Sequence, residues 1–224
     1  MQRVVTPELL DEDLGTPEEI RSTLLDLRSF NEHFGGFHSV GELVRNVAAK
    51  NKLRSLSFLD VAGGRGDVAD YVQSALQKDG IQGRATVLDR ALSHMTGTDF
   101  GLGSVAGDAL RLPFAAESFD VVGCNLFCHH LEPSEVVSFF DEALRVARLA
   151  VIASDLRRNL FHWLVASIGR FTYRSRLTRN DAPASVRRAY TLDEISGLAR
   201  KSAATGFDIS PYYFQRVGLT LWKR

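Results

Sequence analysis

One stretch, residues 56–67, constrains the fold of this chain more than any other. It reads Leu-Ser-Phe-Leu-Asp-Val-Ala-Gly-Gly-Arg-Gly-Asp and precedes an amphipathic helical pattern. An apolar run ends at Asp60, and Gly63, Gly64 and Gly66 follow it. Glycines allow a tight turn and let backbone N–H groups approach a ligand, and the next helix adds the positive end of its dipole. The stretch therefore predicts a strand, a glycine turn and a helix that together hold a nucleotide-like cofactor.

Two kinds of cofactor are compatible with these glycines. Residues 64–69 fit the G-x-G-x-x-A form of the dinucleotide fingerprint, which is a weak signal on its own. Asp60 favours another cofactor, because a carboxylate repels a pyrophosphate but tolerates an ammonium or a sulfonium group. The pattern Asp60-x-Ala62-x-Gly64-x-Gly66 resembles the first motif of class I S-adenosylmethionine-dependent methyltransferases, usually D/E-x-G-x-G-x-G. Ala62 stands where that family usually has glycine, and the glycine after it predicts an altered turn.

Composition narrows the class of protein. The chain has 224 residues and a net charge of zero, so no general attraction to nucleic acid or to a membrane is expected. It contains no apolar run of about 18 residues and no apolar core of a signal peptide near its first residue. Cys124 and Cys128 are too few for a disulfide framework. We therefore expect one α/β domain over residues 1–224, in a reducing cytoplasm.

The hydrophobic patterns divide this domain into parts. Residues 1–53 predict a helical N-terminal cap, with capping boxes at 16–19 and 39–42 on either side of a loop at 31–38. Residues 54–155 alternate strands and helices, which predicts a cofactor-binding half with a parallel sheet covered on both faces. We expect strands near 55–60, 84–89, 103–107, 119–124 and 149–155, and helices near 66–78, 91–96 and 134–147.

The remaining parts are an insertion and a closing segment. Residues 156–190 separate the fifth strand from the next helix, and we expect a lid there. Residues 191–224 begin with a third capping box and continue into strands near 207–214 and 217–222. Such a hairpin places an antiparallel strand in a mostly parallel sheet of seven strands, which is typical of the class I methyltransferase fold. We therefore predict this Rossmann-like α/β fold, with a helical cap and an inserted lid.

Further polar residues follow the ends of the expected strands. Asp89 ends the second strand, where an acid can bind ribose hydroxyls in either class of cofactor. Asp108 and Ala109 belong to a Gly-Asp-Ala segment, and Leu-Pro-Phe and Ser-Phe-Asp-Val-Val follow it. This string resembles the small-molecule methyltransferases related to the ubiquinone and menaquinone C-methylases, and the resemblance implies that Asp108 and Ala109 contact the adenine. S-adenosyl-L-methionine is the predicted cofactor, and the predicted cofactor residues are Asp60, Ala62, Gly63, Gly64, Gly66, Asp89, Arg90, Asp108, Ala109 and Asn125.

A cysteine and histidine segment follows the fourth strand. Its Cys-x3-Cys-His-His order suggests a metal site, but structural zinc sites favour closer cysteine pairs with a separate second pair, so we expect no metal. His129 or His130 is the candidate general base near the transferred methyl group, because imidazole titrates near neutral pH. The competing role is that of a structural histidine at the start of a helix, and the sequence favours this structural role. It does not show which of the two histidines points into the site.

The insertion at 156–190 is rich in arginine. It has eight arginines, one acidic residue and no lysine, and it includes a short apolar helix near 160–168. In class I methyltransferases an insertion at this place commonly covers the acceptor. Aromatic and guanidinium groups suit a planar or anionic acceptor such as a phenolate, a quinone or a carboxylate. The predicted acceptor-binding residues are Phe34, Phe37, Arg157, Arg158, His162, Trp163, Arg187, Arg188 and Tyr190.

Other interpretations of this insertion stay open. The lid could lie on a membrane and admit a lipid-like acceptor. The arginines could instead form a solvated face that pairs with the acidic N-terminal helices. Nothing in the sequence sets an oligomeric state.

The resemblance as a whole implies methyl transfer to a small-molecule acceptor. The region 155–190 is similar to a bacterial group of methyltransferase-domain proteins that often accompany type III polyketide synthases and flavin oxidoreductases. A phenolic or quinol secondary metabolite, methylated on oxygen or carbon, is the expected acceptor. The alternatives are a non-catalytic S-adenosylmethionine-binding partner of a biosynthetic complex and an NAD(P)-dependent oxidoreductase.

Overall fold

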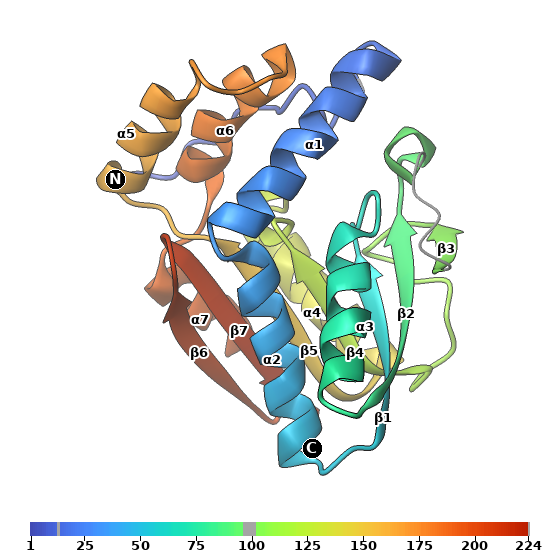
Figure 1. Ribbon diagram of the computed structural model, residues 1–224. Coiled ribbons are helices and arrows are strands. Elements are labelled where there is room, and N and C mark those ends of the chain that lie inside the picture. Colours follow the sequence, from blue (N-terminus) through green and yellow to red (C-terminus); the bar gives the residue numbers. More distant parts are fainter. Residues whose placement is uncertain (13, 96–101, 224) are drawn as a thin grey trace.

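The computed structural model describes residues 1–12, 14–95 and 102–223, and a seven-stranded sheet lies at its centre (Figure 1). The strand order is β3-β2-β1-β4-β5-β7-β6. Neighbouring strands are parallel from β3 to β5, and β7 is antiparallel to both β5 and β6. The predicted mostly parallel sheet with an antiparallel C-terminal hairpin is confirmed. The strands are β1 (Ser55–Val61), β2 (Gln82–Asp89), β3 (Gly103–Ala106), β4 (Phe119–Asn125), β5 (Ala147–Leu156), β6 (Gly206–Tyr212) and β7 (Arg216–Trp222).

Helices cover both faces of the sheet. On β1, Phe58 packs with α2 and α3, whereas Leu59 packs with α4 and α7, because neighbouring strand residues point to opposite faces. The remaining helices α1, α5 and α6 lie above the carboxyl ends of the parallel strands (Figure 1). The helices are α1 (Pro17–His33), α2 (Gly36–Lys50), α3 (Asp67–Lys78), α4 (Pro133–Val146), α5 (Leu160–Gly169), α6 (Arg176–Arg188) and α7 (Leu192–Ala199), with 3-10 turns η1 (Leu92–Met95) and η2 (Cys128–His130).

Two of the predicted capping boxes form. Thr16 and Glu19 exchange hydrogen bonds at the start of α1, and Thr191 and Glu194 do so at the start of α7. These reciprocal bonds satisfy backbone N–H groups that a helix start leaves without partners.

The capping box predicted at 39–42 is wrong. The chain turns at Gly35, where φ is 76°, and α2 begins at the next residue. Ser39 therefore lies inside the helix, buried, and its Oγ is 2.7 Å from Ser154 Oγ. The predicted loop at 31–38 is correspondingly short, because only Phe34 and Gly35 separate α1 from α2.

The short helix predicted near 91–96 corresponds to η1, and residue 96 lies outside the described residues. None of the described helices combines the length and the apolar character that a membrane crossing requires.

The N-terminal strap, residues 1–12, lies along α6. The N–H of Val4 donates to the carbonyl of Arg187 at 3.1 Å. The N–H groups of Leu9 and Leu10 donate to the carboxylate of Asp181 at 3.0 and 3.1 Å. These bonds bring the strap over the carboxyl edge of the sheet, beside the glycine turn.

Candidate active site

The glycine turn after β1 uses left-handed backbone conformations. The φ angles are 56° at Ala62, 51° at Gly64 and 82° at Gly66. Glycine adopts these angles freely, whereas a residue with a Cβ does so at a cost of about 1 kcal/mol. Ala62 thus takes the conformation that a glycine would take at this place in the motif, with the added strain.

Asp60 is buried beneath this turn. Its side chain is 1% exposed, and its Oδ2 has no hydrogen-bond partner among the described residues. Burial, assisted by the charge of Asp89, raises the pKa of Asp60 to about 8. A Cβ on Gly63 would lie 2.8 Å from Asp60 Oδ2, so a glycine is needed there. A buried carboxyl group with an oxygen left over is a natural partner for a cationic group on a ligand.

A cavity of about 450 Å³ adjoins the turn, and we call it the glycine-turn cavity. Asp89 accepts hydrogen bonds from the N–H groups of Gly64 and Ala91, both at 2.9 Å. Asp108 Oδ1 accepts one from the N–H of Leu110 at 2.9 Å. Each carboxylate oxygen can accept a further hydrogen bond, so both acids can still bind a ligand. The predicted cofactor residues that line this cavity are Asp60, Ala62, Gly63, Gly64, Asp89, Arg90, Asp108, Ala109 and Asn125, while Gly66 precedes α3 beside it.

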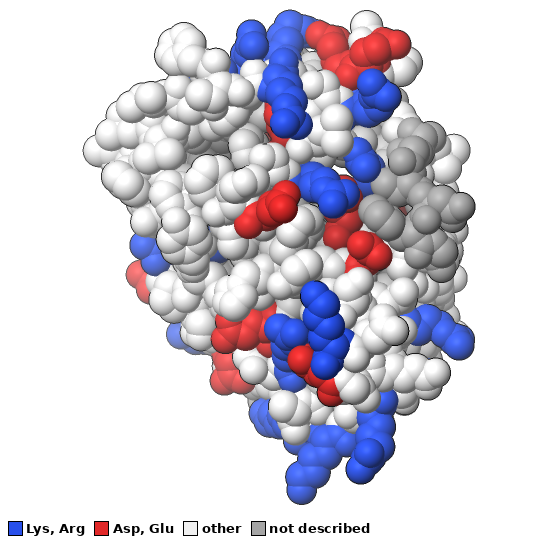
Figure 2. Space-filling view, viewed as in Figure 1, with Lys and Arg blue, Asp and Glu red and all other residues white. Residues whose placement is uncertain are grey.

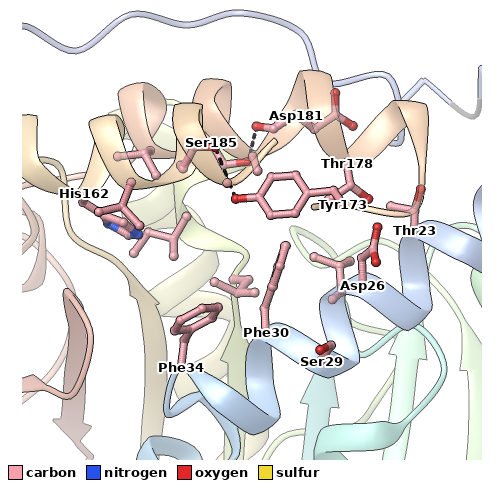
Figure 3. A pocket seen from close by; sticks show the side chains of 18 of the residues that line it. Thr23, Asp26, Ser29, Phe30, Phe34, His162, Tyr173, Thr178, Asp181 and Ser185 are labelled. Atoms are coloured by element: carbon pink, nitrogen blue, oxygen red, sulfur yellow. Dashed lines mark hydrogen bonds between the residues drawn. The ribbon is translucent and has the colours of Figure 1, made fainter. Parts of the chain in front are cut away.

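A second cavity of about 640 Å³ lies between α1 and the α5–α6 insertion, and we call it the lid cavity (Figure 3). Phe30 of α1 and Phe34, just after that helix, form one wall, and Tyr173 faces them. The rings of Phe30 and Tyr173 meet edge to face, with centroids 5.1 Å apart. Aromatic walls of this kind suit a flat or apolar ligand.

The charged lining of the lid cavity is mostly acidic. Glu8, Asp26 and Asp181 line it, together with Arg174 and Arg216. The carboxylates of Asp26 and Asp181 already accept backbone N–H groups. An acceptor that entered as an anion would meet these acids, so a neutral group that donates a hydrogen bond fits the cavity better.

The two cavities meet. Leu10, Leu27, Leu126 and His130 line both of them. A molecule in one cavity therefore lies next to a molecule in the other, with the His129 and His130 pair at the boundary.

His129 is held by a buried acid at this boundary. Its Nδ1 is 2.6 Å from Asp155 Oδ1, and its backbone N–H donates to Asp155 Oδ2 at 2.9 Å. Burial alone would raise the pKa of Asp155, but the charge and hydrogen bond of His129 outweigh burial and hold that pKa below its usual value. An ionised Asp155 keeps a proton on Nδ1, which leaves Nε2 of a neutral imidazole able to accept a proton.

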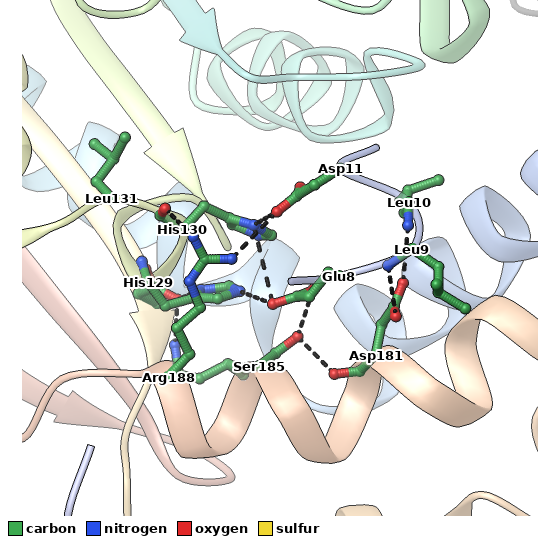
Figure 4. A network of polar contacts seen from close by, with 12 residues as sticks. Glu8, Leu9, Leu10, Asp11, His129, His130, Leu131, Asp181, Ser185 and Arg188 are labelled. Carbon is green, nitrogen blue, oxygen red and sulfur yellow. Dashed lines mark hydrogen bonds and ion pairs between the residues drawn. The ribbon is translucent and has the colours of Figure 1, made fainter. Parts of the chain in front are cut away.

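Glu8 of the strap faces both histidines (Figure 4). It is 5% exposed; its Oε2 accepts a hydrogen bond from Ser185 Oγ at 2.8 Å, and its Oε1 has no hydrogen-bond partner among the described residues. Glu8 Oε1 lies 3.8 Å from His129 Nε2 and 3.9 Å from His130 Nδ1. Burial raises the pKa of Glu8 to about 7, although the charge of His130 opposes the rise. Proton-accepting groups are therefore gathered where the cavities meet.

The same three side chains are close enough to share a cation. Glu8, His129 and His130 each offer a ligand atom, and these atoms lie within 4.8 Å of one another. The Nδ1 atoms of the two histidines already contact Asp155 and Asp11, at 2.6 and 2.7 Å. A cation bound through Nδ1 of His130 would have to displace Asp11 from that atom.

The structure disperses the predicted acceptor-binding residues. Phe34 and His162 line the lid cavity, and Arg188 lines the glycine-turn cavity. The residues that line neither cavity are Phe37, Arg157, Arg158, Trp163, Arg187 and Tyr190.

Several of these outlying side chains have structural partners. The ring of Phe37 stacks on Tyr71, with centroids 5.2 Å apart. Arg158 is buried and contacts Glu194 at 2.6 Å. The hydroxyl of Tyr190 donates to the carbonyl of Leu131 at 2.8 Å.

Other arginines of the insertion pair with acidic residues of the N-terminal region. This agrees with the alternative interpretation, in which these arginines pair with the acidic N-terminal helices. Arg188 contacts Asp11 at 3.3 Å, and Arg176 contacts Glu19 at 2.9 Å.

The sequence interpretation missed Glu8, Asp155, Tyr173 and Arg216. Asp155 lies at the carboxyl end of the apolar strand β5, and this position was a usable signal. Glu8 and Arg216 reach the site only through contacts between distant segments, so no local pattern marks them. Burial lowers the pKa of Arg216 to about 10, although the negative charge of Asp155 opposes this.

Comparison with known proteins agrees with this geometry. Residues 58–149 match the family model described as a methyltransferase domain. The chain contains a methyltransferase domain. No curated protein matches it in sequence.

Solved structures show which fold the chain as a whole resembles. A SAM-dependent methyltransferase from Aquifex aeolicus superposes with a TM-score of 0.63 at 17% identity, covering 94% of this chain and 100% of that one. The plantazolicin methyltransferase BpumL in complex with SAH gives 0.67 at 13% identity, covering 90% of both chains. Human N-acetylserotonin methyltransferase in complex with SAM gives 0.65 at 11% identity, covering 92% of this chain and 56% of that one.

The predicted class I methyltransferase fold is therefore confirmed. A methyltransferase domain in this fold implies S-adenosylmethionine as the methyl donor, so the predicted enzyme class and cofactor are confirmed to that extent. The narrower resemblance to the ubiquinone and menaquinone group is not confirmed.

Proposed function

We propose that this methyltransferase transfers the methyl group of S-adenosylmethionine to a phenolic or quinol hydroxyl of a small, largely apolar acceptor. The observation that carries the proposal is the junction of the two cavities. His130 lines both of them, and next to it His129 and Glu8 line the lid cavity, with Asp155 behind His129. The cofactor occupies the glycine-turn cavity and the acceptor occupies the lid cavity in this account.

The residues of the glycine-turn cavity fit this cofactor. When bound, S-adenosylmethionine supplies a methyl group on a sulfonium, which is a good leaving group. Asp60 offers a buried carboxyl oxygen without a partner to a cationic group. Asp89, Asp108 and Ala109 also line this cavity. In this proposal Asp89, at the end of β2, binds the ribose hydroxyls, and Asp108 with Ala109 contacts the adenine.

The lid cavity supports a neutral, ring-containing acceptor. Phe30, Phe34 and Tyr173 give it aromatic walls, and its acids disfavour an acceptor that arrives as an anion. A phenolic hydroxyl, with a pKa of about 10, arrives neutral and can donate a hydrogen bond. Holding this hydroxyl against the methyl group in a site away from water supplies most of the rate enhancement.

The chain also supplies a proton acceptor. His129 Nε2 takes the hydroxyl proton while the acceptor oxygen gains the methyl group, and the ionised Asp155 stabilises the imidazolium that forms. Glu8 Oε1, 3.8 Å from His129 Nε2, provides a second acceptor through which the proton can leave.

The names of structural neighbours support a small natural product as the acceptor class. BpumL has been crystallised with a pentazolic desmethylPZN analog and SAH. Another neighbour, from Anabaena variabilis, is described as a putative methyltransferase from an antibiotic biosynthesis pathway, with a TM-score of 0.52 at 17% identity.

The test is His129→Gln assayed with phenols of graded acidity. For a phenol of pKa about 10, we expect the variant to lose about 100-fold in kcat/KM, because general base catalysis contributes about that much. For a nitrophenol of pKa about 7 the loss should shrink below about tenfold, because that acceptor ionises without help.

Two controls accompany this assay. His38→Gln replaces an exposed histidine that pairs with Glu42, and it should leave both rates unchanged. The wild type, His129→Gln and His38→Gln should bind S-adenosylhomocysteine with the same affinity. An equal loss for both phenols would contradict the role of His129 as base.

A further inference from the structure

α5 is apolar on both of its sides. It carries no acidic residue, lysine or arginine over Leu160–Gly169. One side lines the lid cavity through His162, Val165, Ala166 and Gly169. The other side is exposed through Leu160, Phe161, Leu164 and Ile168. A helix that is apolar all round is normally covered on all sides.

The exposed side continues into neighbouring segments. Ile168 is 69% exposed, and Phe171, just after α5, is 76% exposed. Phe161 and Tyr213 both meet the ring of Phe214, with centroid distances of 6.4 and 6.0 Å. We define the α5 patch as Leu160, Phe161, Leu164, Ile168, Phe171 and Tyr213.

Single exposed apolar residues are common, but a contiguous group marks a contact surface. Figure 2 shows the surface around α5, at the upper left, as a broad area without charged side chains.

Guanidinium groups flank the α5 patch. Arg170 Cζ lies 5.0 Å from the ring centroid of Phe171, and Arg174 and Arg179 are exposed on the segment that follows. The ion pair found here joins Arg176 to Glu19; within the described part of the chain, Arg170, Arg174 and Arg179 have no acidic partner. This local charge contrasts with the net charge of zero of the chain.

The lid cavity reaches the surface beside the α5 patch. Among its lining residues, His33, Phe34, Thr172 and Arg174 are exposed. Thr172 directly follows Phe171 of the patch, and Arg174 belongs both to the cavity lining and to the basic flank. An acceptor that enters here passes along the patch.

We infer that the α5 patch docks on an anionic lipid bilayer, and that the lid cavity receives an amphiphilic acceptor from that bilayer. An exposed apolar patch with arginines beside it combines the two features that bind a protein surface to an anionic bilayer, which are buried apolar area and attraction to anionic lipid. A second copy of the chain fits less well, because a two-fold contact would bring the arginines of both copies together, and neither the patch nor its flank contains an acidic residue. The membrane docking is inferred from the α5 patch and its flanking arginines alone, whereas the class of acceptor rests on the proposed function.

The test is flotation of the full chain with phosphatidylcholine vesicles that contain or lack phosphatidylglycerol. We expect binding to the anionic vesicles, and weaker binding by about fivefold for each arginine in Arg170→Gln and Arg174→Gln. The double variant Phe161→Ser/Ile168→Ser should bind at least about 30-fold more weakly, because two large apolar side chains no longer enter the interface.

Leu92→Ser is the matched control. Leu92 is 67% exposed, as exposed as Ile168, but it belongs to η1 at the end of β2, away from α5 (Figure 1). It should float like the wild type. Equal flotation of Leu92→Ser and Phe161→Ser/Ile168→Ser, or no flotation of the wild type, would overturn the docking.

Two further measurements separate the docking from the proposed function. Sedimentation of the wild type should give a monomer that Phe161→Ser/Ile168→Ser leaves unchanged; a dimer that this variant dissociates would assign the patch to a second copy and overturn the inference. A water-soluble phenol assayed without vesicles should be methylated equally by the wild type and by the double variant, so a failure of methyl transfer there would count against the proposed function and not against the docking.

Discussion

At the scale of single residues, the site depends on carboxyl groups in unfavourable surroundings. Asp60 and Glu8 are buried, each with an oxygen that lacks a hydrogen-bond partner among the described residues, and burial raises their pKa values to about 8 and about 7. Such groups lower stability and are retained where a ligand or a proton makes use of them. Substitution of Asp60 tests this stability cost without knowledge of the methyl acceptor.

Asp60→Asn should stabilise the free protein relative to the wild type increasingly as the pH rises. The pKa of Asp60 is about 8 in the folded protein, against an ordinary value of 3.8. Between these two pH values the folded wild type holds a proton that the unfolded chain has lost, so its stability falls as the pH rises. From pH 5 to pH 8 the difference in free energy of unfolding should move by about 3 kcal/mol in favour of the variant. Urea unfolding at several pH values measures this.

The same substitution should weaken binding of S-adenosylhomocysteine by about tenfold, because an amide cannot pair with an ammonium group as a carboxylate does. Calorimetric titration provides the measurement. If the free energy of unfolding depends on pH in the same way in Asp60→Asn and in the wild type, then Asp60 is ionised in the folded state, which would contradict this account of its pKa.

At the scale of elements, α1 forms part of both cavities and has to be held in place. Arg216, at the start of β7, donates to the carbonyl of Phe34 and to the side chains of Asn31 and Asn125, each at 3.0 Å. One buried guanidinium thus ties the end of α1 to β4. Asn31 and Asn125 also line the glycine-turn cavity, so this tie shapes the cavity that we propose binds the cofactor.

Arg216→Met should lower the free energy of unfolding by about 3 kcal/mol, because it removes three hydrogen bonds of a buried guanidinium, one of them to the buried Asn31. Urea unfolding provides the measurement. The affinity of Arg216→Met for S-adenosylhomocysteine should also be lower than that of the wild type.

Arg157→Met is the control for this change. Its guanidinium is only partly buried and donates to Gln215 Oε1 at 3.1 Å, so a loss below about 1 kcal/mol is expected. Equal losses in the two variants would contradict the role given to Arg216.

At the scale of the whole molecule, the sequence predicts which residues line the glycine-turn cavity better than which residues line the lid cavity. The glycine turn, Asp89 and Asp108 lie at or just after the carboxyl end of a strand within one continuous stretch, so local pattern and strand order place them together. Glu8 comes from the strap and Arg216 from the hairpin, and only the packing of α1 and α6 over the sheet brings them to the same cavity. Charge counting also misplaced the lid arginines, because Arg158 is committed to Glu194 and to backbone carbonyls.

In the function that we propose, the donor and the acceptor of the methyl group meet at the boundary of the two cavities. The most direct measurement is mass spectrometry of methyl transfer from labelled S-adenosylmethionine to a panel of phenols, quinols and amines, with Asp89→Ala beside the wild type. We predict label on a hydroxyl oxygen of a phenol or quinol, and S-adenosylhomocysteine binding weakened by about 30-fold or more in Asp89→Ala, which loses the acceptor for the ribose. S-adenosylhomocysteine binding by the wild type with no label on any acceptor would contradict the claim and favour a non-catalytic cofactor-binding partner.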